Sequence, residues 1–198
     1  MSKPFYLSFY LFGVLWPPFI IGSIFVIWGS GEDLTSTAWK ATLLLSFLVE
    51  AIPVAVGCMF IYSIWESIQG GRARTTPAKA VGYMFIPLFN IYWTFQVIWG
   101  FAEDYNRLIH SKGLPIKKLP ENLFLAVPTL LFVPGAVRLA AAVGQFPDLY
   151  ALSALVGGAA LFSDIIIAGM VIAKSCDAVN ALSDEQSKPA LSLEDISQ

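Results

Sequence analysis

Long apolar segments alternate with short polar segments along most of this chain. Four apolar segments have at least roughly the 20 residues that a helix needs to cross a bilayer core. They are residues 5–28, 39–65, 122–143 and 150–173. The pattern predicts an all-α integral membrane protein with four transmembrane helices, built as a single polytopic domain over residues 1–183.

A fifth apolar segment, residues 81–102, has a proline and an asparagine near its centre. Pro87 removes a backbone hydrogen bond and disfavours helix in the residue before it, while the Asn90 side chain can satisfy backbone groups freed by a break. We therefore predict that residues 77–110 form a broken helical segment, either re-entrant or interfacial. The alternative is a kinked but complete fifth transmembrane helix.

Capping residues predict where the neighbouring helices begin and end. Thr76 followed by Pro77 suits an N-cap and a first helical position, since proline lacks only an amide that would be unpaired there. Gly113 suits a C-terminal stop, and Pro120 with Glu121 suits the first turn of the next helix.

Lysine and arginine collect in cytoplasmic loops, and their distribution favours the re-entrant arrangement. With both termini inside, only Lys40 and Arg138 lie nearer the outside. Not counting Arg138, five full spans would place four basic residues inside and seven outside, or seven inside and four outside with the N-terminus reversed. In the re-entrant arrangement ten are cytoplasmic: Lys3, Arg72, Arg74, Lys79, Arg107, Lys112, Lys117, Lys118, Lys174 and Lys188. Six loop residues are predicted to meet anionic headgroups and orient the protein: Arg72, Arg74, Lys79, Arg107, Lys117 and Lys118.

Composition agrees with a membrane protein and argues against a nucleic-acid partner. Hydrophobic residues make up 57% of the 198 residues and charged residues 13%, whereas soluble domains carry about 25% charged residues. The 14 acidic and 12 basic side chains nearly cancel, and there is no basic block. After Lys174 the sequence becomes polar, which predicts a helix end and then a disordered cytoplasmic tail over residues 184–198.

The run TPAKAVGYMFIPLFNIYWTFQVIWGFAEDYNRL resembles the core of a bacterial family of small membrane proteins of unknown function. In that family a Pro-x-x-Asn box followed by aromatic residues sits between hydrophobic spans. The resemblance covers about a third of the chain. It implies a multi-pass protein of the bacterial inner (cytoplasmic) membrane, and it brings no known activity.

Three ionisable residues fall within the predicted spans, where a charge needs a partner or water. They are Glu50, Arg138 and Asp164, and with Asn90 at the helix break they form a candidate intramembrane polar site. Helical spacing places Asp164 on one face with Ala168, where helices pack. We expect Arg138 to reach Glu50 more easily than Asp164, which leaves Asp164 as a candidate for binding a cation or relaying protons.

Small residues predict which helices touch. Ala136, Ala140 and Gly144 form one ridge, Ala154 and Gly158 another, and the short turn between them predicts a close antiparallel hairpin.

The sequence contains no Ser-His-Asp or metal-ligand arrangement, so we predict a non-enzymatic protein without a cofactor. The leading hypothesis is an accessory or structural subunit of a membrane complex, or a homo-oligomer, associating through small-residue helix faces. The alternative is a small ion, proton or solute transporter or channel that uses its buried carboxylates.

Overall fold

The computed structural model describes residues 1–11, 37–70, 73–144 and 146–187. Every regular element in these residues is helical, which confirms the predicted all-α class. Most of the first predicted span lies outside the described residues. The elements are a helix over residues 3–11, α2 (Thr37–Ser67), α3 (Pro77–Gly82), the 3-10 helix η1 (Tyr83–Phe85), α4 (Phe89–Ser111), α5 (Glu121–Val143) and α6 (Pro147–Ser187).

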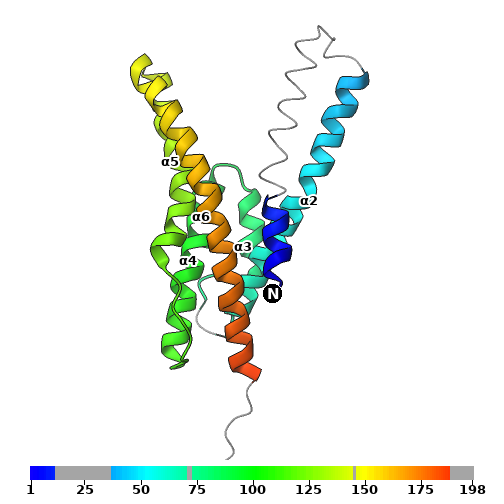
Figure 1. Ribbon diagram of the computed structural model, residues 1–198, viewed down its shortest axis with the longest axis vertical. Helices are drawn as coiled ribbons and strands as arrows, with labels where there is room; N and C mark the ends of the chain where they lie inside the picture. Colours follow the sequence, from blue (N-terminus) through cyan, green and yellow to red (C-terminus); the bar gives the residue numbers. More distant parts are fainter. Residues whose placement is uncertain (12–36, 71–72, 145, 188–198) are drawn as a thin grey trace, which may run out of the picture.

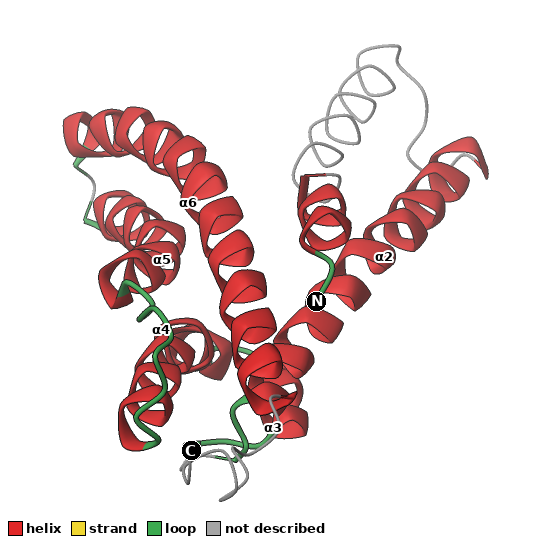
Figure 2. Cartoon of the chain, turned by 60° about the horizontal axis from the view of Figure 1, so that its bottom comes forward, coloured by secondary structure: helices red, strands yellow, loops and turns green. Residues whose placement is uncertain are grey.

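The helices form two arms that diverge from a common base. Figure 1 shows α5 and α6 rising together as one arm and α2 rising as the other, with α3 between the arms and α4 below α5 at the base. The N-terminus, the end of α4 and the end of α6 all lie toward this base. Seen from the second direction, α6 runs from the tip of its own arm down to the lower end of α2 (Figure 2).

Within the described residues, two helices are long and apolar enough to cross a membrane by length and composition. They are Glu121–Ala141 within α5 and Phe162–Ser187 within α6, and α2 adds a shorter apolar stretch, Ala51–Ser67. Large apolar side chains on the α5–α6 arm are exposed, including Leu139 at 67% and Phe162 at 68%. These helices overlap the predicted spans 122–143 and 150–173, so the number of four transmembrane helices stays a prediction.

The hydrophobic core lies in the base, where the end of α2, the length of α4 and the start of α5 meet the end of α6. Its largest members are fully buried: Trp65, Tyr105, Phe101, Phe124, Ile68 and Leu182. Phe101 packs against both Trp65 and Phe124 at ring-centroid distances of 6.2 Å, which joins three helices through aromatic contacts. Because Phe101 of α4 contacts aromatic rings of both α2 and α5, burial of these side chains holds α4 at the centre of the core.

The predicted helix break between α3 and α4 is confirmed. Leu88 has φ 63° and ψ −41°, and the Phe89 amide donates to the Pro87 carbonyl at 2.7 Å, so Leu88 is the centre of a strained γ-turn. The chain reverses there, and the α3–α4 hairpin ends below the tips of the two arms (Figure 1). The Trp93 indole donates to the Ala80 carbonyl at 3.0 Å and closes the hairpin.

The predicted helix ends on either side of this hairpin are also confirmed. The Thr76 hydroxyl accepts from the Lys79 amide at 3.4 Å, and Pro77 is the first residue of α3. Gly113 adopts φ 62° just after α4, a left-handed conformation that favours glycine, and α5 begins at Glu121.

The predicted α5–α6 hairpin is present, but the α5 half of its predicted contact ridge is wrong. The side chains of Ala154 and Gly158, the α6 half, lie outside the described part of the structure. A Cβ on Gly157 would lie 3.8 Å from the Pro134 Cβ, so the helices approach at that pair. Ala141 is buried, whereas Ala136, Ala140 and Gly144 are exposed. Ala141 follows Ala140 by one residue, which is about 100° around the helix, so the covered face of α5 is the neighbour of the predicted one.

The predicted helix end after Lys174 is wrong, because α6 continues to Ser187. The extension is stabilised by packing, since Ala178 and Leu182 are buried in the base. Lys3 pairs with Asp177 at 2.8 Å, and the N-terminal amine donates to the Asn180 side chain. The remainder of the predicted tail, residues 188–198, lies outside the described residues.

Candidate functional site

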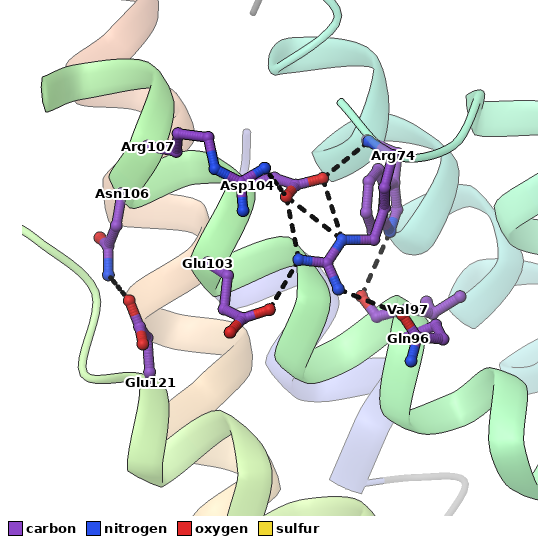
Figure 3. A network of polar contacts seen from close by, with 9 residues as sticks. Arg74, Gln96, Val97, Glu103, Asp104, Asn106, Arg107 and Glu121 are labelled. Atoms are coloured by element: carbon purple, nitrogen blue, oxygen red, sulfur yellow. Dashed lines mark hydrogen bonds and ion pairs between the residues drawn. The ribbon is translucent and has the colours of Figure 1, made fainter. Parts of the chain in front are cut away.

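A buried acid on α4 is the centre of an ion-pair cluster at the base. The Asp104 side chain is 1% exposed and accepts from the Arg74 amide at 2.8 Å and from the Arg74 guanidinium at 3.0 Å. Arg107, one helical turn later, donates to the same carboxylate at 3.0 Å. Arg74 thereby ties the segment before α3 to α4 with both its backbone and its side chain (Figure 3).

Two further side chains on α4 complete the binding of Arg74. Its guanidinium pairs with Glu103 at 2.6 Å and donates to the Gln96 side chain at 3.1 Å. A Cβ on Gly100 would lie 2.7 Å from a guanidinium nitrogen, so glycine at this position gives the arginine room to lie against the helix. Each charged group of the cluster thus has an opposite charge in contact, and the arrangement serves to hold the hairpin in place.

The cluster keeps Arg74 charged. Partial burial lowers the pKa of Arg74, but hydrogen bonds and charge interactions with Asp104 and Glu103 outweigh this effect and raise the pKa above its usual value. Burial raises the pKa of Tyr105, whose neutral hydroxyl lies 3.5 Å from the Ala178 carbonyl on α6. These groups therefore stay in one protonation state near neutral pH.

Two more side chains hold α4 in the base through hydrogen bonds. The Trp65 indole donates to the Val97 carbonyl at 3.2 Å, which links α2 to α4. Asn106 donates to the Leu119 carbonyl at 2.9 Å and to Glu121 at 2.8 Å, and it accepts from the Leu119 amide at 2.8 Å. Asn106 therefore fixes the connection between α4 and α5, as Figure 3 shows for its bond to Glu121.

The basic residues of these loops were predicted to act as topology signals, and Asp104 was not predicted. The structure places Arg74 and Arg107 on that carboxylate, while Lys79, Lys117 and Lys118 are exposed and Arg72 lies outside the described residues. Two signals could have identified the acid. It precedes Arg107 by three residues, and it shares a helical face with the core residues Val97 and Phe101.

A second feature is an apolar cavity of about 640 Å³ above the base. Helices from the whole chain contribute to its lining, with Tyr10 from the first, Phe60 from α2, Val97 from α4 and Phe124 from α5, while α6 contributes Asp164 among others. The Tyr10 hydroxyl donates to the Ile165 carbonyl at 3.1 Å, so that helix 3–11 is bonded to α6 beside the cavity.

Two residues of α6 that line this cavity each have a buried polar atom without a hydrogen-bond partner. Asp164 Oδ1 and Ser175 Oγ are both buried, and neither has a hydrogen-bond partner among the described residues. The predicted shared face of Asp164 and Ala168 is confirmed, because both line the cavity. Ser175 is fully buried and was not predicted, although its spacing of eleven residues from Asp164 also places it on that face.

Of the other members of the predicted intramembrane site, only Asn90 has a described side chain. Asn90 lies at the break in the α3–α4 hairpin and does not line the cavity. The backbone groups near the break are satisfied by other backbone groups, as when the Asn90 amide donates to the Ile86 carbonyl at 3.0 Å. Glu50 lies in α2 and Arg138 in α5, but their side chains are outside the described part of the structure, so their pairing stays a prediction.

Comparison with known proteins does not identify a relative. No family model matches the chain, and no curated protein or solved structure matches it either. Within the described residues, no group of three or more histidine, cysteine or acidic side chains is placed to hold a metal ion. The predicted family resemblance therefore stays a prediction.

Proposed function

We propose that this chain is a non-enzymatic integral membrane protein that crosses the bilayer four times. In this proposal the α3–α4 hairpin enters the lipid and returns to the side from which it came. Both termini lie on that side, which the lysine and arginine count identifies as the cytoplasm. The proposed location in a bacterial inner membrane follows from the family resemblance.

The observation that carries this proposal is the gathering of chain ends at the base. Both ends of the hairpin lie there with the N-terminus and the end of α6 (Figure 1). The charged contacts collect at the same end: Arg74 with Asp104, and Lys3 with Asp177. The opposite arms expose apolar side chains, as expected for surfaces covered by lipid.

The tip of the hairpin supports its insertion into lipid. Phe85, Ile86 and Leu88 are exposed there, Leu88 to 83%, and Tyr92 lies nearby at 56%. An apolar tip of this kind is unfavourable in water and favourable in the bilayer. Its irregular backbone has internal hydrogen bonds around the break, which a chain segment needs at membrane depth.

Cysteine labelling tests the topology directly. Starting from a chain in which Cys58 and Cys176 are replaced by alanine, single cysteines are placed at Ala78, Lys117 or Asp148, which are all exposed. We expect a membrane-impermeant maleimide to label positions 78 and 117 from the same face of oriented vesicles, and position 148 from the other. Labelling of positions 78 and 117 from opposite faces would overturn the re-entrant hairpin.

We further propose that the protein acts through assembly with a protein partner or with itself. The exposed ridge of Ala136, Ala140 and Gly144 supports this role, since small residues at four-residue spacing let helices approach closely in lipid. Native gel electrophoresis after mild solubilisation is the test. A stable stoichiometric assembly is expected, and a monomer at all protein concentrations would contradict the proposal.

Transport is a second candidate, which the buried Oδ1 of Asp164, without a hydrogen-bond partner beside a cavity, favours. Proteoliposomes loaded with a pH-sensitive dye provide the measurement. Transport predicts a proton or cation flux that Asp164→Asn abolishes and Asp148→Asn retains. Equal flux in all three proteins and in empty liposomes would remove this candidate.

A further inference from the structure

The cavity between the two arms has the dimensions of a binding site for an elongated molecule. Its volume of about 640 Å³ lies within the roughly 300–1,000 Å³ typical of ligand pockets. Asp164 and Ser175 are separated by eleven residues of one helix, or about 16 Å along its axis. The intervening wall is apolar, with Ala168 and Val171 on the same face of α6.

The unpartnered polar atoms show what kind of group this cavity lacks. Asp164 Oδ1 is a buried acceptor and Ser175 Oγ a fully buried hydroxyl, and neither is bonded to another described residue. A buried polar atom without a partner is unfavourable by about 1–3 kcal/mol, and more if it is charged. A ligand that donates to Asp164 would therefore gain both a hydrogen bond and relief of this penalty.

A cationic donor satisfies Asp164 better than a neutral one, because an ammonium group also neutralises the carboxylate. A bare metal ion fits poorly, since Ca²⁺ takes about six to eight oxygen ligands and the cavity offers one carboxylate at this end. The aromatic rings of Tyr10 and Phe60 line the same cavity and suit a cation attached to an apolar body.

We propose that this cavity binds a lipophilic amine, an elongated apolar molecule with an ammonium group at the Asp164 end. Its apolar body lies along Ala168 and Val171, and a polar group at its other end reaches the Ser175 hydroxyl. The inference concerns a ligand and stands apart from the proposed assembly. It also holds whether or not the protein moves the ligand across the membrane.

Binding of two probes of equal length tests the proposal. Radiolabelled dodecylamine and dodecanol are titrated onto the full-length protein in phosphatidylcholine nanodiscs, with binding to empty nanodiscs subtracted. Nanodiscs leave both membrane faces accessible, so the result does not depend on the proposed topology. We expect saturable binding of dodecylamine at least tenfold tighter than that of dodecanol.

Variants on α6 distinguish binding of the probes at the cavity from their general partitioning into lipid. Asp164→Asn is expected to weaken dodecylamine binding about tenfold and to leave dodecanol binding unchanged. Asp148→Asn removes the same charge from an exposed position on the same helix and should bind dodecylamine as the wild type does. Ala168→Leu fills the cavity between the two polar groups and should weaken both probes.

Three results would overturn the inference. The first is equal affinity of the wild type for the two probes, and the second is wild-type affinity of Asp164→Asn for dodecylamine. The third is displacement of both probes by an excess of phospholipid. The last result would identify the cavity as a lipid-filled space. The wild-type comparison of the two probes decides the question even if Asp164→Asn fails to fold, which thermal unfolding and gel filtration would reveal.

Discussion

Removing the Asp104 carboxylate leaves two arginines without their shared partner. We expect Asp104→Ala to lower the free energy of unfolding by about 3 kcal/mol, because breaking a buried ion pair leaves an uncompensated charge in the base. Arg74 keeps its contacts with Glu103 and Gln96, which limits the loss. Chemical unfolding in detergent micelles, followed by tryptophan fluorescence, measures the change.

Glu103→Ala is the matched control, since it removes a neighbouring acid that is 27% exposed and pairs with the same arginine. A partly exposed pair contributes up to about 1 kcal/mol. The two substitutions should therefore differ by at least about 2 kcal/mol. Equal losses would show that burial of Asp104 does not set the strength of the cluster.

The γ-turn at Leu88 stores strain that a glycine would relieve. A residue with a Cβ pays about 1–2 kcal/mol for a left-handed conformation, whereas glycine adds up to about 1 kcal/mol of backbone entropy loss. We expect Leu88→Gly to raise the free energy of unfolding by roughly 0.5–1 kcal/mol in micelles. Ile86→Gly is the control, because Ile86 has φ −85° and offers no strain to relieve. A stability gain in both variants would contradict the explanation.

At the residue scale, the sequence identified Asp164 but not its surroundings. An acid within an apolar span is visible from composition alone, and helical spacing gave its shared face with Ala168 correctly. Asp104 was missed because its partner Arg74 is 30 residues away, and only the chain reversal at Leu88 brings the two together. The local spacing to Arg107 and to the core residues marks Asp104 as a buried acid, but it does not reveal Arg74 as the partner.

At the element scale, Asn106 determines how α4 is joined to α5. We expect Asn106→Asp to lower the free energy of unfolding by about 2–3 kcal/mol, because the aspartate cannot donate to the Leu119 carbonyl and places a second negative charge beside Glu121. Adding Glu121→Gln should restore about 1 kcal/mol, since the repulsion is removed. A double-mutant cycle of unfolding free energies measures the coupling, and strictly additive effects would contradict it.

The boundaries of the helices were predictable where backbone chemistry decides them. Thr76 and Pro77 predicted the start of α3, and Pro87 predicted the break that follows it. Gly113 predicted the stop after α4, because glycine readily adopts a positive φ. The end of α6 was not predictable in this way. Its last turns are polar and remain helical because Leu182 is buried against the base.

At the scale of the whole molecule, the apolar and charged surfaces are separated along the long axis. The base contains the ion pairs and the buried aromatic core, and the arms expose Leu139, Phe162 and other large apolar side chains. Sequence hydropathy predicts this separation, because the lengths of the apolar and polar segments decide where each kind of surface lies along the axis. It does not predict which helical faces remain uncovered, since that depends on the phase at which α5 meets α6.

The uncovered ridge of α5 leads to a prediction about assembly. Because Ala136, Ala140 and Gly144 are exposed and closely spaced along one face, a partner helix can approach the α5 backbone there. We expect Ala140→Trp to dissociate the assembly, with at least a tenfold rise in its dissociation constant in single-molecule photobleaching across a range of protein-to-lipid ratios. Leu139→Trp adds the same side chain about 100° around the helix, at a position already 67% exposed, and should leave assembly intact. Disruption by both variants would assign the contact to general crowding of the arm, and disruption by Leu139→Trp alone would move the interface to the adjacent face.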